Sequence, residues 1–420
     1  MKILQNDRLC LLATIGLALA LRIAAVGFLH IEPESDAYAY MQMATSMLNS
    51  GHMDDGQGNV AFYSAGYPLF LVPFFALFQA SPETAQAVNI VLGAVAVFLV
   101  YLCAAAALPD RRWAVVPALL WATYPPALLY TEYVLKENVL IPLFLLQTYL
   151  LLRYADSGRK NLTALGLGFI FGCELLVGAA VTLTGALIAL AVTGVMGRRW
   201  SLSGLTWRPA LLCALGCAVA ITPWLTYTNA KLGKPVLNTN GGFNLYLGNN
   251  PNATGYFVGI QETPIAPQWH AIKKEKGEIG ATAVLEELAI GHILDNPGKT
   301  FVLSLKKLAY FWWPPVHEGK YGNQSSLETL MRLAWLFYYT LIVAFALIPL
   351  AALRGRNSRP LALLYGTVLL YCAIHAAAYV IYRYRLPAMP LMTILAAAGI
   401  HYVYLWCVTA RSRNRSHQAS

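Results

Sequence analysis

The chain has 420 residues, of which 58% are apolar or aromatic and only 12% are charged, against about 25% charged residues in soluble domains. Such a composition excludes a soluble globular domain, a disordered chain, a collagen-like chain and a disulfide scaffold, and it indicates an integral membrane protein with several spans. The net charge of +10 comes mostly from short basic clusters between apolar runs. Membrane topology explains this pattern better than nucleic-acid binding, so no nucleic-acid partner is expected.

Ten apolar runs are long enough to cross a bilayer, for which a helix needs roughly 17–25 residues. They lie at about residues 9–29, 84–107, 113–130, 138–153, 161–177, 179–196, 209–228, 329–352, 361–380 and 387–408. The first run could be a cleaved signal peptide, because Lys2 and Arg8 precede it, but its length and the lack of a convincing cleavage site before Pro33 favour an uncleaved anchor. We therefore expect an all-α polytopic membrane protein with about ten transmembrane helices, forming one domain over residues 1–420.

Short basic segments predict the orientation of these spans. Sixteen of the 30 lysines and arginines lie in the two termini and in four short loops, and with ten spans all six segments fall on one side. The positive-inside rule makes this side cytoplasmic, so both termini are expected there, with residues 409–420 as a basic cytoplasmic tail. Residues 161–196 are short for two full crossings, yet the charge pattern favours two short or tilted helices over a single one.

The opposite side receives two large segments, residues 30–83 and 229–328. In the first, carboxylates at Glu32, Glu34 and Asp36 follow the first span directly. The next stretch, up to Gly51, has apolar side chains at helical spacing and predicts a helix lying along the membrane interface. Asp36 would lie at the N-terminus of that helix, where a negative charge is favoured, and on these local features alone an N-cap role is the better explanation.

Further along, two more patterns stand out in the outer segments. A Gly-Tyr-Pro turn at residues 66–68 leads into an apolar run that is too short to span, which predicts a re-entrant or interfacial helix. In the second segment, residues 273–293 look like an amphipathic helix, and Lys306 and Lys307 stand beside aromatic residues in a pattern typical of a membrane belt.

Three groups of residues, taken in this order and on these sides of the membrane, resemble the GT-C superfamily of glycosyltransferases that use polyprenyl-phosphate sugars. They are Ser35-Asp36-Ala37-Tyr38 with Ala65-Gly66-Tyr67-Pro68, then Thr222-Pro223-Trp224 followed by Asn238 to Pro251, and then His375 with Arg383-Tyr384-Arg385-Leu386-Pro387. The nearest branch is the bacterial one that is similar to protein O-mannosyltransferases and aminoarabinose transferases. The resemblance covers most of the chain.

This resemblance implies a GT-C-like bundle with interfacial helices in the first periplasmic loop, and a hexosyl- or pentosyltransferase in the bacterial cytoplasmic membrane. The donor would be a polyprenyl-phosphate-linked sugar, the acceptor a lipid, a glycan or a protein, and the site would face the periplasm among membrane lipids. The family's acceptor-activating aspartate matches Asp36, so the resemblance implies that Asp36 is the catalytic general base of an inverting transfer.

Candidate substrate-binding residues follow from the charge of the leaving group. A polyprenyl phosphate needs cationic donors, and arginine suits phosphate because its fork reaches two oxygens. Arg383 and Arg385, interleaved with Tyr382 on the outer turn 381–386, are the first candidates, and Lys136 on the outer turn 131–137 is another. These side chains could also merely reach up to lipid headgroups.

Four further residues complete the list of substrate-binding candidates. Glu132 and Glu137 flank Lys136 and could pair with it, bind sugar or help to hold a cation. His375 could line a lipid cleft or bond a neighbouring helix, and Tyr67 belongs to the Gly-Tyr-Pro turn. A divalent cation, Mg or Mn, could bind near Asp36 with a second carboxylate, although the spacing does not demand a metal and no cofactor is certain.

Two rival functions explain part of the same pattern. A transporter or lipid flippase would account for about ten spans and buried polar residues, but it predicts paired repeats and polar residues near the midplane of the bilayer. The sequence has no such repeat, and its carboxylates cluster at the outer surface. A non-catalytic membrane partner protein would tolerate the change Asp36→Asn, whereas an enzyme would not.

Overall fold

The computed structural model describes residues 7–194, 206–314, 326–353 and 359–418, and these are almost entirely helical. In chain order the α-helices are α1 (Asp7–Leu29), α2 (Asp36–Ser50), α3 (Gly66–Leu77), α4 (Pro82–Ala107), α5 (Val115–Ala122), α6 (Pro125–Glu132), α7 (Glu137–Tyr154), α8 (Lys160–Val177), α9 (Gly185–Val192), α10 (Trp207–Leu232), α11 (Gly241–Gly248), α12 (Ala266–Asp295), α13 (Pro297–Trp312), α14 (Ser326–Leu347), α15 (Arg359–Ala373) and α16 (Met389–Gln418). Within the described ranges, the β-structure is a single isolated bridge between Tyr256 and Val380.

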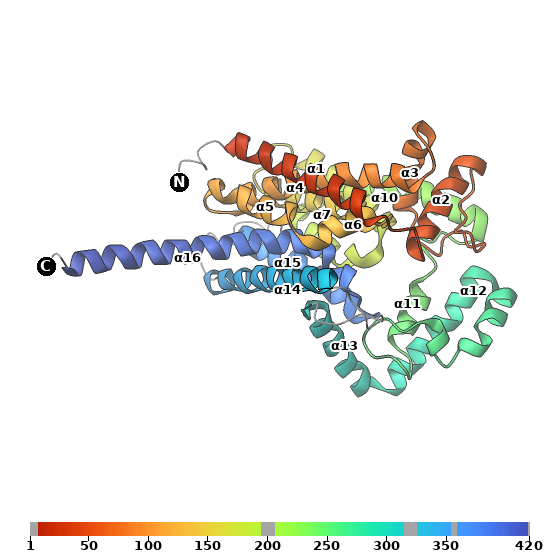
Figure 1. Ribbon diagram of the computed structural model, residues 1–420. Helices are drawn as coiled ribbons and strands as arrows, with labels where there is room; N and C mark the ends of the chain where they lie inside the picture. Colours follow the sequence, from red (N-terminus) through yellow and green to blue (C-terminus); the bar gives the residue numbers. More distant parts are fainter. Residues whose placement is uncertain (1–6, 195–205, 315–325, 354–358, 419–420) are drawn as a thin grey trace.

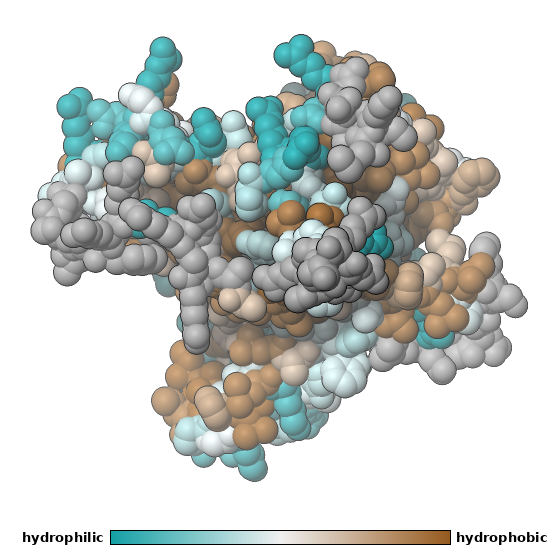
Figure 2. All heavy atoms as spheres, turned by 90° about the vertical axis from the view of Figure 1, so that its left-hand side faces the viewer, coloured by the Kyte–Doolittle hydropathy of each residue, from teal (hydrophilic) through white to brown (hydrophobic). Residues whose placement is uncertain are grey.

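The long helices form one bundle, and the helices of the two outer segments gather around one of its ends. Both termini lie at the left-hand end of the bundle in Figure 1, whereas α2, α3, α11 and α12 lie at the opposite end. Hydrophilic side chains gather over much of the end where the termini lie (Figure 2). This arrangement puts the predicted outer loops together, away from the termini.

Seven helices of the described part of the chain are long and apolar enough to cross a membrane. They are Asp7–Leu29, Pro82–Ala107, Lys160–Val177, Trp207–Leu232, Thr329–Ala351, Arg359–Ala376 and Tyr382–Ser412. The expected all-α polytopic bundle is therefore confirmed, but by length and composition it has seven full spans here and not about ten. The other three expected spans correspond to shorter or more polar helices. The run at 113–130 is α5 with α6, the run at 138–153 is α7, which has Glu137 and Arg153 at its ends, and the last run is the short apolar stretch Ala179–Val192.

Proline and glycine explain the breaks in two of these regions, residues 113–130 and 161–196. The run at 113–130 breaks between α5 and α6, where Pro125 starts a new helix because a proline ring cannot continue the preceding one. The run at 161–196 breaks at Gly178, which has an extended backbone and separates α8 from the short 3₁₀-helix Ala179–Thr184 and α9. Two separate segments are thus present here, as the charge pattern indicates, although residues 195–205 lie outside the described part.

The ends of other elements follow local signals. α2 begins at Asp36 and ends at Ser50, and the left-handed backbone of the next residue, Gly51 (φ 68°), allows its N–H to bond the carbonyl of Met47. The predicted helix is thus present, and its position along the membrane interface stays a prediction. The last span differs from the prediction. Its helix α16 does not stop near Val408 but runs on to Gln418, so most of the predicted 409–420 tail is helical.

Helices α8 and α10 pack closely because small residues face each other along their contact. A Cβ atom added to Gly168 would overlap the carbonyl oxygen of Cys213, and one added to Gly216 would overlap that of Leu165. Gly172 lies one turn further along α8 and faces Cys217 in the same way. Small residues spaced four apart are the usual means by which membrane helices bring their backbones into contact.

We predict that Gly168→Ala destabilises the protein by about 1–3 kcal/mol, because the added methyl group must force α8 and α10 apart. Gly166→Ala on the same helix is the matched control: its added Cβ meets no atom within 4 Å, so it should be neutral or stabilising by up to about 1 kcal/mol. Thermal unfolding of the purified variants in detergent compares them. Equal unfolding midpoints would contradict the close-packing explanation.

Candidate functional site

Asp36 is held at the start of α2 by a short, strained connection from α1. The backbone has positive φ values at His30 (45°) and Ser35 (52°), which non-glycine residues rarely adopt. The N–H of Ile31 donates a 2.8 Å hydrogen bond to Glu132, so the connection is tied to the end of α6. Backbone strain of this kind concentrates at functional sites, where the surrounding structure holds it in place.

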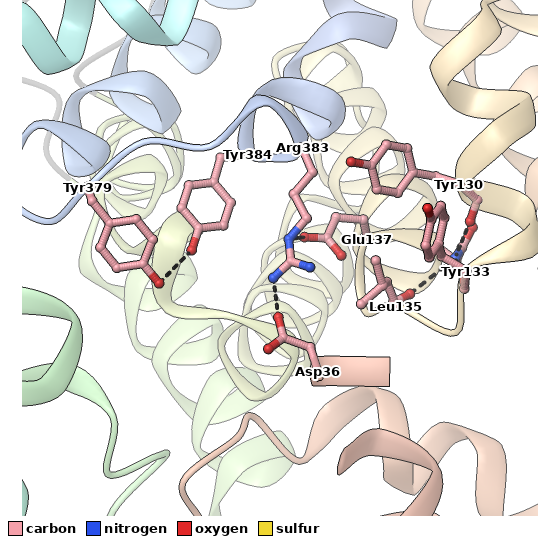
Figure 3. Close-up of polar contacts among 9 residues, drawn as sticks. Asp36, Tyr130, Tyr133, Leu135, Glu137, Tyr379, Arg383 and Tyr384 are labelled. Atoms are coloured by element: carbon pink, nitrogen blue, oxygen red, sulfur yellow. Dashed lines mark hydrogen bonds and ion pairs between the residues drawn. The ribbon is translucent and has the colours of Figure 1, made fainter. Parts of the chain in front are cut away.

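The carboxylate of Asp36 meets the guanidinium of Arg383, although the two residues are far apart in the sequence (Figure 3). Arg383 Nη2 forms an ion pair with Asp36 Oδ2, and Arg383 Nε lies 3.6 Å from Glu137 Oε1. Glu137 is nearly inaccessible, with a 4% exposed side chain, whereas those of Asp36 and Arg383 are 24% and 21% exposed. The trio thus has one deeply buried member and two that are partly exposed.

The turn that carries Glu137 is fixed by two asparagines. Asn138 donates to the carbonyls of Tyr130, Tyr133 and Leu135 at 3.0–3.1 Å. Asn89 of α4 donates to the carbonyls of Thr131 and Tyr133 and accepts a 3.0 Å hydrogen bond from the hydroxyl of Tyr67. Tyr67 is fully buried, so the structure places this candidate behind the site, where it supports the turn.

Lys136 precedes Glu137 on this turn and is half-buried. No hydrogen bond or ion pair of its ammonium group is found with the described residues. The pKa of Lys136 lies below its ordinary value, because burial lowers it more than the negative charges of Glu137 and Asp36 raise it. The side chain extends toward the break at Gly178 between α8 and α9, so it adds a second positive charge close to the trio.

Arg385 lies in a different environment from Arg383. Its guanidinium donates to the carbonyls of Phe311 and Trp313, and it stacks over the rings of Tyr339 (4.3 Å) and Tyr382 (5.0 Å). It is 2% exposed, and its Nε and Nη2 atoms have no hydrogen-bond partner among the described residues. The expected pair of arginines is therefore divided: Arg383 turns to Asp36, and Arg385 joins the end of α13 to α14.

Two other candidates are placed around the trio and not within it. Glu132 is 1% exposed and holds the Ile31 backbone. His375 is buried, with Nδ1 3.0 Å from the carbonyl oxygen of Tyr371, and its ring packs against Phe311 and Tyr384. In this structure both residues position neighbouring segments.

Tyrosines that the sequence analysis did not single out surround Asp36. Tyr40 lies one helical turn after Asp36 on α2, and burial followed by the charge of Asp36 raises its pKa well above the usual value. Tyr384 donates a 3.2 Å hydrogen bond to Tyr379 (Figure 3). Tyr379 in turn donates to Asn244 of α11. The four-residue spacing from Asp36 could have revealed Tyr40, since such residues share a helix face, but no sequence signal links Tyr379 to Asp36.

The second outer segment is tied to the stretch that precedes the 3₁₀-helix Tyr382–Ala388, which carries Arg383. The fully buried Lys307 of α13 donates a 3.1 Å hydrogen bond to Asn249, and Asn249 donates a 2.6 Å bond to the carbonyl of Ala377. Val380 donates to the carbonyl of Gly255 at 3.0 Å. Movement of the second outer segment would therefore displace the backbone near Arg383.

The residues present do not fit a divalent cation beside Asp36. No group of three or more His, Cys, Asp and Glu side chains that could hold a metal comes together in the described part of the chain. The second carboxylate near Asp36 is that of Glu137, and the guanidinium of Arg383 contacts both. The positive charge between the two carboxylates is thus supplied by the protein, and no step below is routed through a metal.

Comparison with known families and structures agrees with the predicted resemblance. Residues 65–227 match the family model described as dolichyl-phosphate-mannose-protein mannosyltransferase. Comparison with curated protein sequences finds no match. The matched region includes the Gly-Tyr-Pro helix and the Pro-Trp pair of α10. This match covers less than half of the chain, and it supports the predicted resemblance.

The fold is similar to that of the oligosaccharyltransferase AglB of Archaeoglobus fulgidus. The apo form aligns with a TM-score of 0.53 at 14% identity over 97% of this chain and 51% of that one, and a complex with an inhibitory peptide and a dolichol-phosphate aligns at 0.50 and 12% over 98% and 52%. ArnT from Cupriavidus metallidurans bound to undecaprenyl phosphate aligns more loosely, at 0.48 and 12% over 92% and 77%. The chain spans about half the length of the oligosaccharyltransferases that it matches.

We predict that Arg383→Gln destabilises the protein by about 3 kcal/mol, because it leaves the buried Glu137 carboxylate without its partner. The same change should cost much less in a Glu137→Gln background, where no buried charge is left unpaired. Thermal unfolding of the four proteins in detergent measures this coupling. Arg112→Gln, which breaks an exposed pair with Asp110, is the control and should have little effect. Additive effects of the Arg383 and Glu137 changes would show that the two side chains do not interact.

We also predict that the buried Lys307 makes the stability of the protein depend on pH above about pH 8. Burial lowers the pKa of Lys307 to about 8, so between pH 8 and the ordinary lysine value the unfolded chain binds more protons than the folded one, and stability rises with pH. Relative to Lys307→Met, the wild type should become more stable from pH 8 to pH 10. Unfolding midpoints measured across this range test the sign. A difference between the two proteins that does not change with pH would contradict a shifted pKa.

Proposed function

We propose that the chain is an inverting glycosyltransferase that moves a sugar from a polyprenyl-phosphate donor to an acceptor, with Asp36 as the general base. The observation that carries the proposal is the ion-paired trio of Asp36, Arg383 and Glu137 at the end of the bundle opposite the termini. A partly exposed carboxylate stands there beside a fixed cation, and transfer from a lipid phosphate requires one group of each kind.

The reaction needs a base for the acceptor and positive charge for the leaving group. The acceptor hydroxyl attacks the anomeric carbon of the sugar and passes its proton to Asp36. The bond between that carbon and the phosphate oxygen breaks, and its electron pair stays on the polyprenyl phosphate. Because a single displacement comes from the face opposite the leaving group, the anomeric configuration inverts.

Asp36 has the geometry for this role. Only its Oδ2 atom is engaged by Arg383, and Oδ1 has no hydrogen-bond partner among the described residues. A hydroxyl group could therefore donate to Oδ1 while the ion pair holds the carboxylate in place.

Arg383 and Lys136 are the residues that we assign to the phosphate. The charge of the buried Glu137, 3.6 Å from Nε, attracts the guanidinium of Arg383. Because Asp36 engages Nη2, Nη1 and the second N–H of Nη2 are the groups that we assign to phosphate oxygens. Lys136 has an ammonium group without a protein partner among the described residues, which leaves its charge available for the developing negative charge on the leaving group.

The relatives support a lipid-phosphate donor. The matched family is described by its dolichyl-phosphate-mannose substrate, and the AglB structure with a similar fold contains a dolichol-phosphate. For this chain we propose a donor in which a hexose or a pentose is linked to a polyprenyl phosphate. The basic segments at the end with the termini support an inner-membrane protein with cytoplasmic termini and a periplasmic site.

We predict that Asp36→Asn lowers sugar transfer by at least about 100-fold, because an amide cannot take the proton of the acceptor. Purified protein in detergent would be given a panel of labelled polyprenyl-phosphate sugars, and both transfer and donor consumption would be measured. Glu34→Gln, an exposed neighbour, is the matched control and should retain wild-type activity.

Two outcomes would contradict the proposal. One is that the wild type consumes no donor of the panel, and the other is that Asp36→Asn transfers sugar at the wild-type rate. Movement of the intact donor across a vesicle membrane without transfer would instead favour a lipid flippase.

A further inference from the structure

A second cavity, separate from the trio, lies in the second outer segment. It has a volume of about 710 Å³ and is formed by the end of α12, the first three turns of α13 and the loop that follows α11. Lys299, Lys306 and His292 line it, together with the amide side chains of Asn249, Asn250 and Asn296. No carboxylate lies among the described residues that line it. Such a lining favours an anionic ligand.

The floor of this cavity is rigid. Asn249 and Asn250 are each 2% exposed, and their side-chain amides donate to carbonyls of α11. Asn249 also accepts the hydrogen bond from the buried Lys307, which adds a positive charge beneath the cavity. The lysines at the rim, Lys299 and Lys306, are exposed, so they can close on a ligand from the side of solvent.

The size of the cavity indicates more than a single small ion. Its volume is typical of sites for ligands of headgroup size, which occupy about 300–1,000 Å³. A bare phosphate would leave most of this space empty. The ligand that best fits both the charge and the volume carries a phosphate together with further polar groups.

Exposed apolar side chains beside the cavity indicate that this ligand belongs to a lipid. On α13, Lys299 and Lys306 share the face that lines the cavity, whereas Phe301 and Leu305 lie on another face and are 65% and 51% exposed. Leu294, at the end of α12, is 72% exposed. The lobe formed by α12 and α13 presents apolar and hydrophilic side chains next to each other (Figure 2), as expected of a helix that lies in the membrane interface.

We propose that this cavity binds the phosphate-bearing headgroup of a lipid in the outer leaflet, and that this lipid is the acceptor of the transfer reaction. The apolar face of α13 enters the leaflet, and Lys299, Lys306 and His292 hold the headgroup. The acceptor role rests on the function proposed above. The hydrogen bonds from Asn249 to Ala377 and from Val380 to Gly255 connect this cavity to the backbone that carries Arg383.

Binding is tested first, without any reaction. The full-length protein in neutral detergent is titrated with dioctanoyl phosphatidic acid, with dioctanoylglycerol and with inorganic phosphate. The wild type should bind the phosphatidic acid much more tightly than either of the others. The double variant Lys299→Gln/Lys306→Gln should bind it about 30-fold more weakly, because each lysine contributes roughly 1 kcal/mol to attraction of an anionic lipid.

Matched controls separate this site from a general effect of positive charge. Lys274→Gln/Lys276→Gln removes two exposed lysines of α12 that do not line the cavity, and it should bind as the wild type does. Asp36→Asn should also bind normally. Equal binding by the Lys299/Lys306 variant and the wild type would overturn the site, and equal binding of inorganic phosphate or dioctanoylglycerol would overturn its assignment to an anionic lipid.

The acceptor role has its own readout. With an accepted donor and phosphatidylglycerol, whose headgroup carries a phosphate and free hydroxyl groups, labelled sugar should appear in this anionic lipid. Lys299→Gln/Lys306→Gln should raise the KM for phosphatidylglycerol with kcat largely retained. Label found only in neutral lipid or in protein would overturn the acceptor assignment. If the wild type transfers no sugar at all but still binds phosphatidic acid, the proposed function fails while the binding site stands.

Discussion

A buried carboxylate at the edge of a membrane bundle is costly unless a cation accompanies it, and Glu137 imposes this requirement here. Arg383 meets it, and because a guanidinium has several donor groups it also reaches Asp36. Three segments that are far apart in the sequence must therefore converge: the connection after α1, the turn between α6 and α7, and the stretch before α16. The shape of the candidate site follows from this convergence.

The neighbouring contacts hold these three segments in place. Glu132 bonds the connection after α1, Asn89 and Tyr67 support the turn, and Lys307 with Asn249 ties the second outer segment to the stretch before Arg383. Each of these polar groups is buried and hydrogen-bonded, as a low-dielectric environment demands. Residues that the sequence indicates as substrate ligands thus partly serve to position the site.

Periodicity and composition predict much of the fold, since long apolar runs, the helix α2 and the break near Gly178 all depend on local sequence. Seven helices of the described residues are long and apolar enough to cross a membrane unbroken, and Pro125 divides the run at 113–130 that hydropathy alone treats as continuous. Asp36 and Arg383 could be predicted as site residues by the family resemblance. Their ion pair could not, nor could the separation of Arg385 from the site, because two residues so close in a tight turn point in different directions and only tertiary packing decides which one meets Asp36.

The central claim is that donor and acceptor meet at Asp36 and Arg383. A cryo-electron microscopy structure of the full chain with a non-hydrolysable phosphonate analogue of a polyprenyl-phosphate sugar tests it most directly. The account predicts that the phosphonate contacts Arg383 and Lys136 and that the anomeric carbon lies within about 6 Å of the Asp36 carboxylate. This limit adds about 3 Å from the carboxylate to the acceptor oxygen and about 3 Å from that oxygen to the anomeric carbon. A donor analogue bound at a different place, with Asp36 and Arg383 out of its reach, would contradict it.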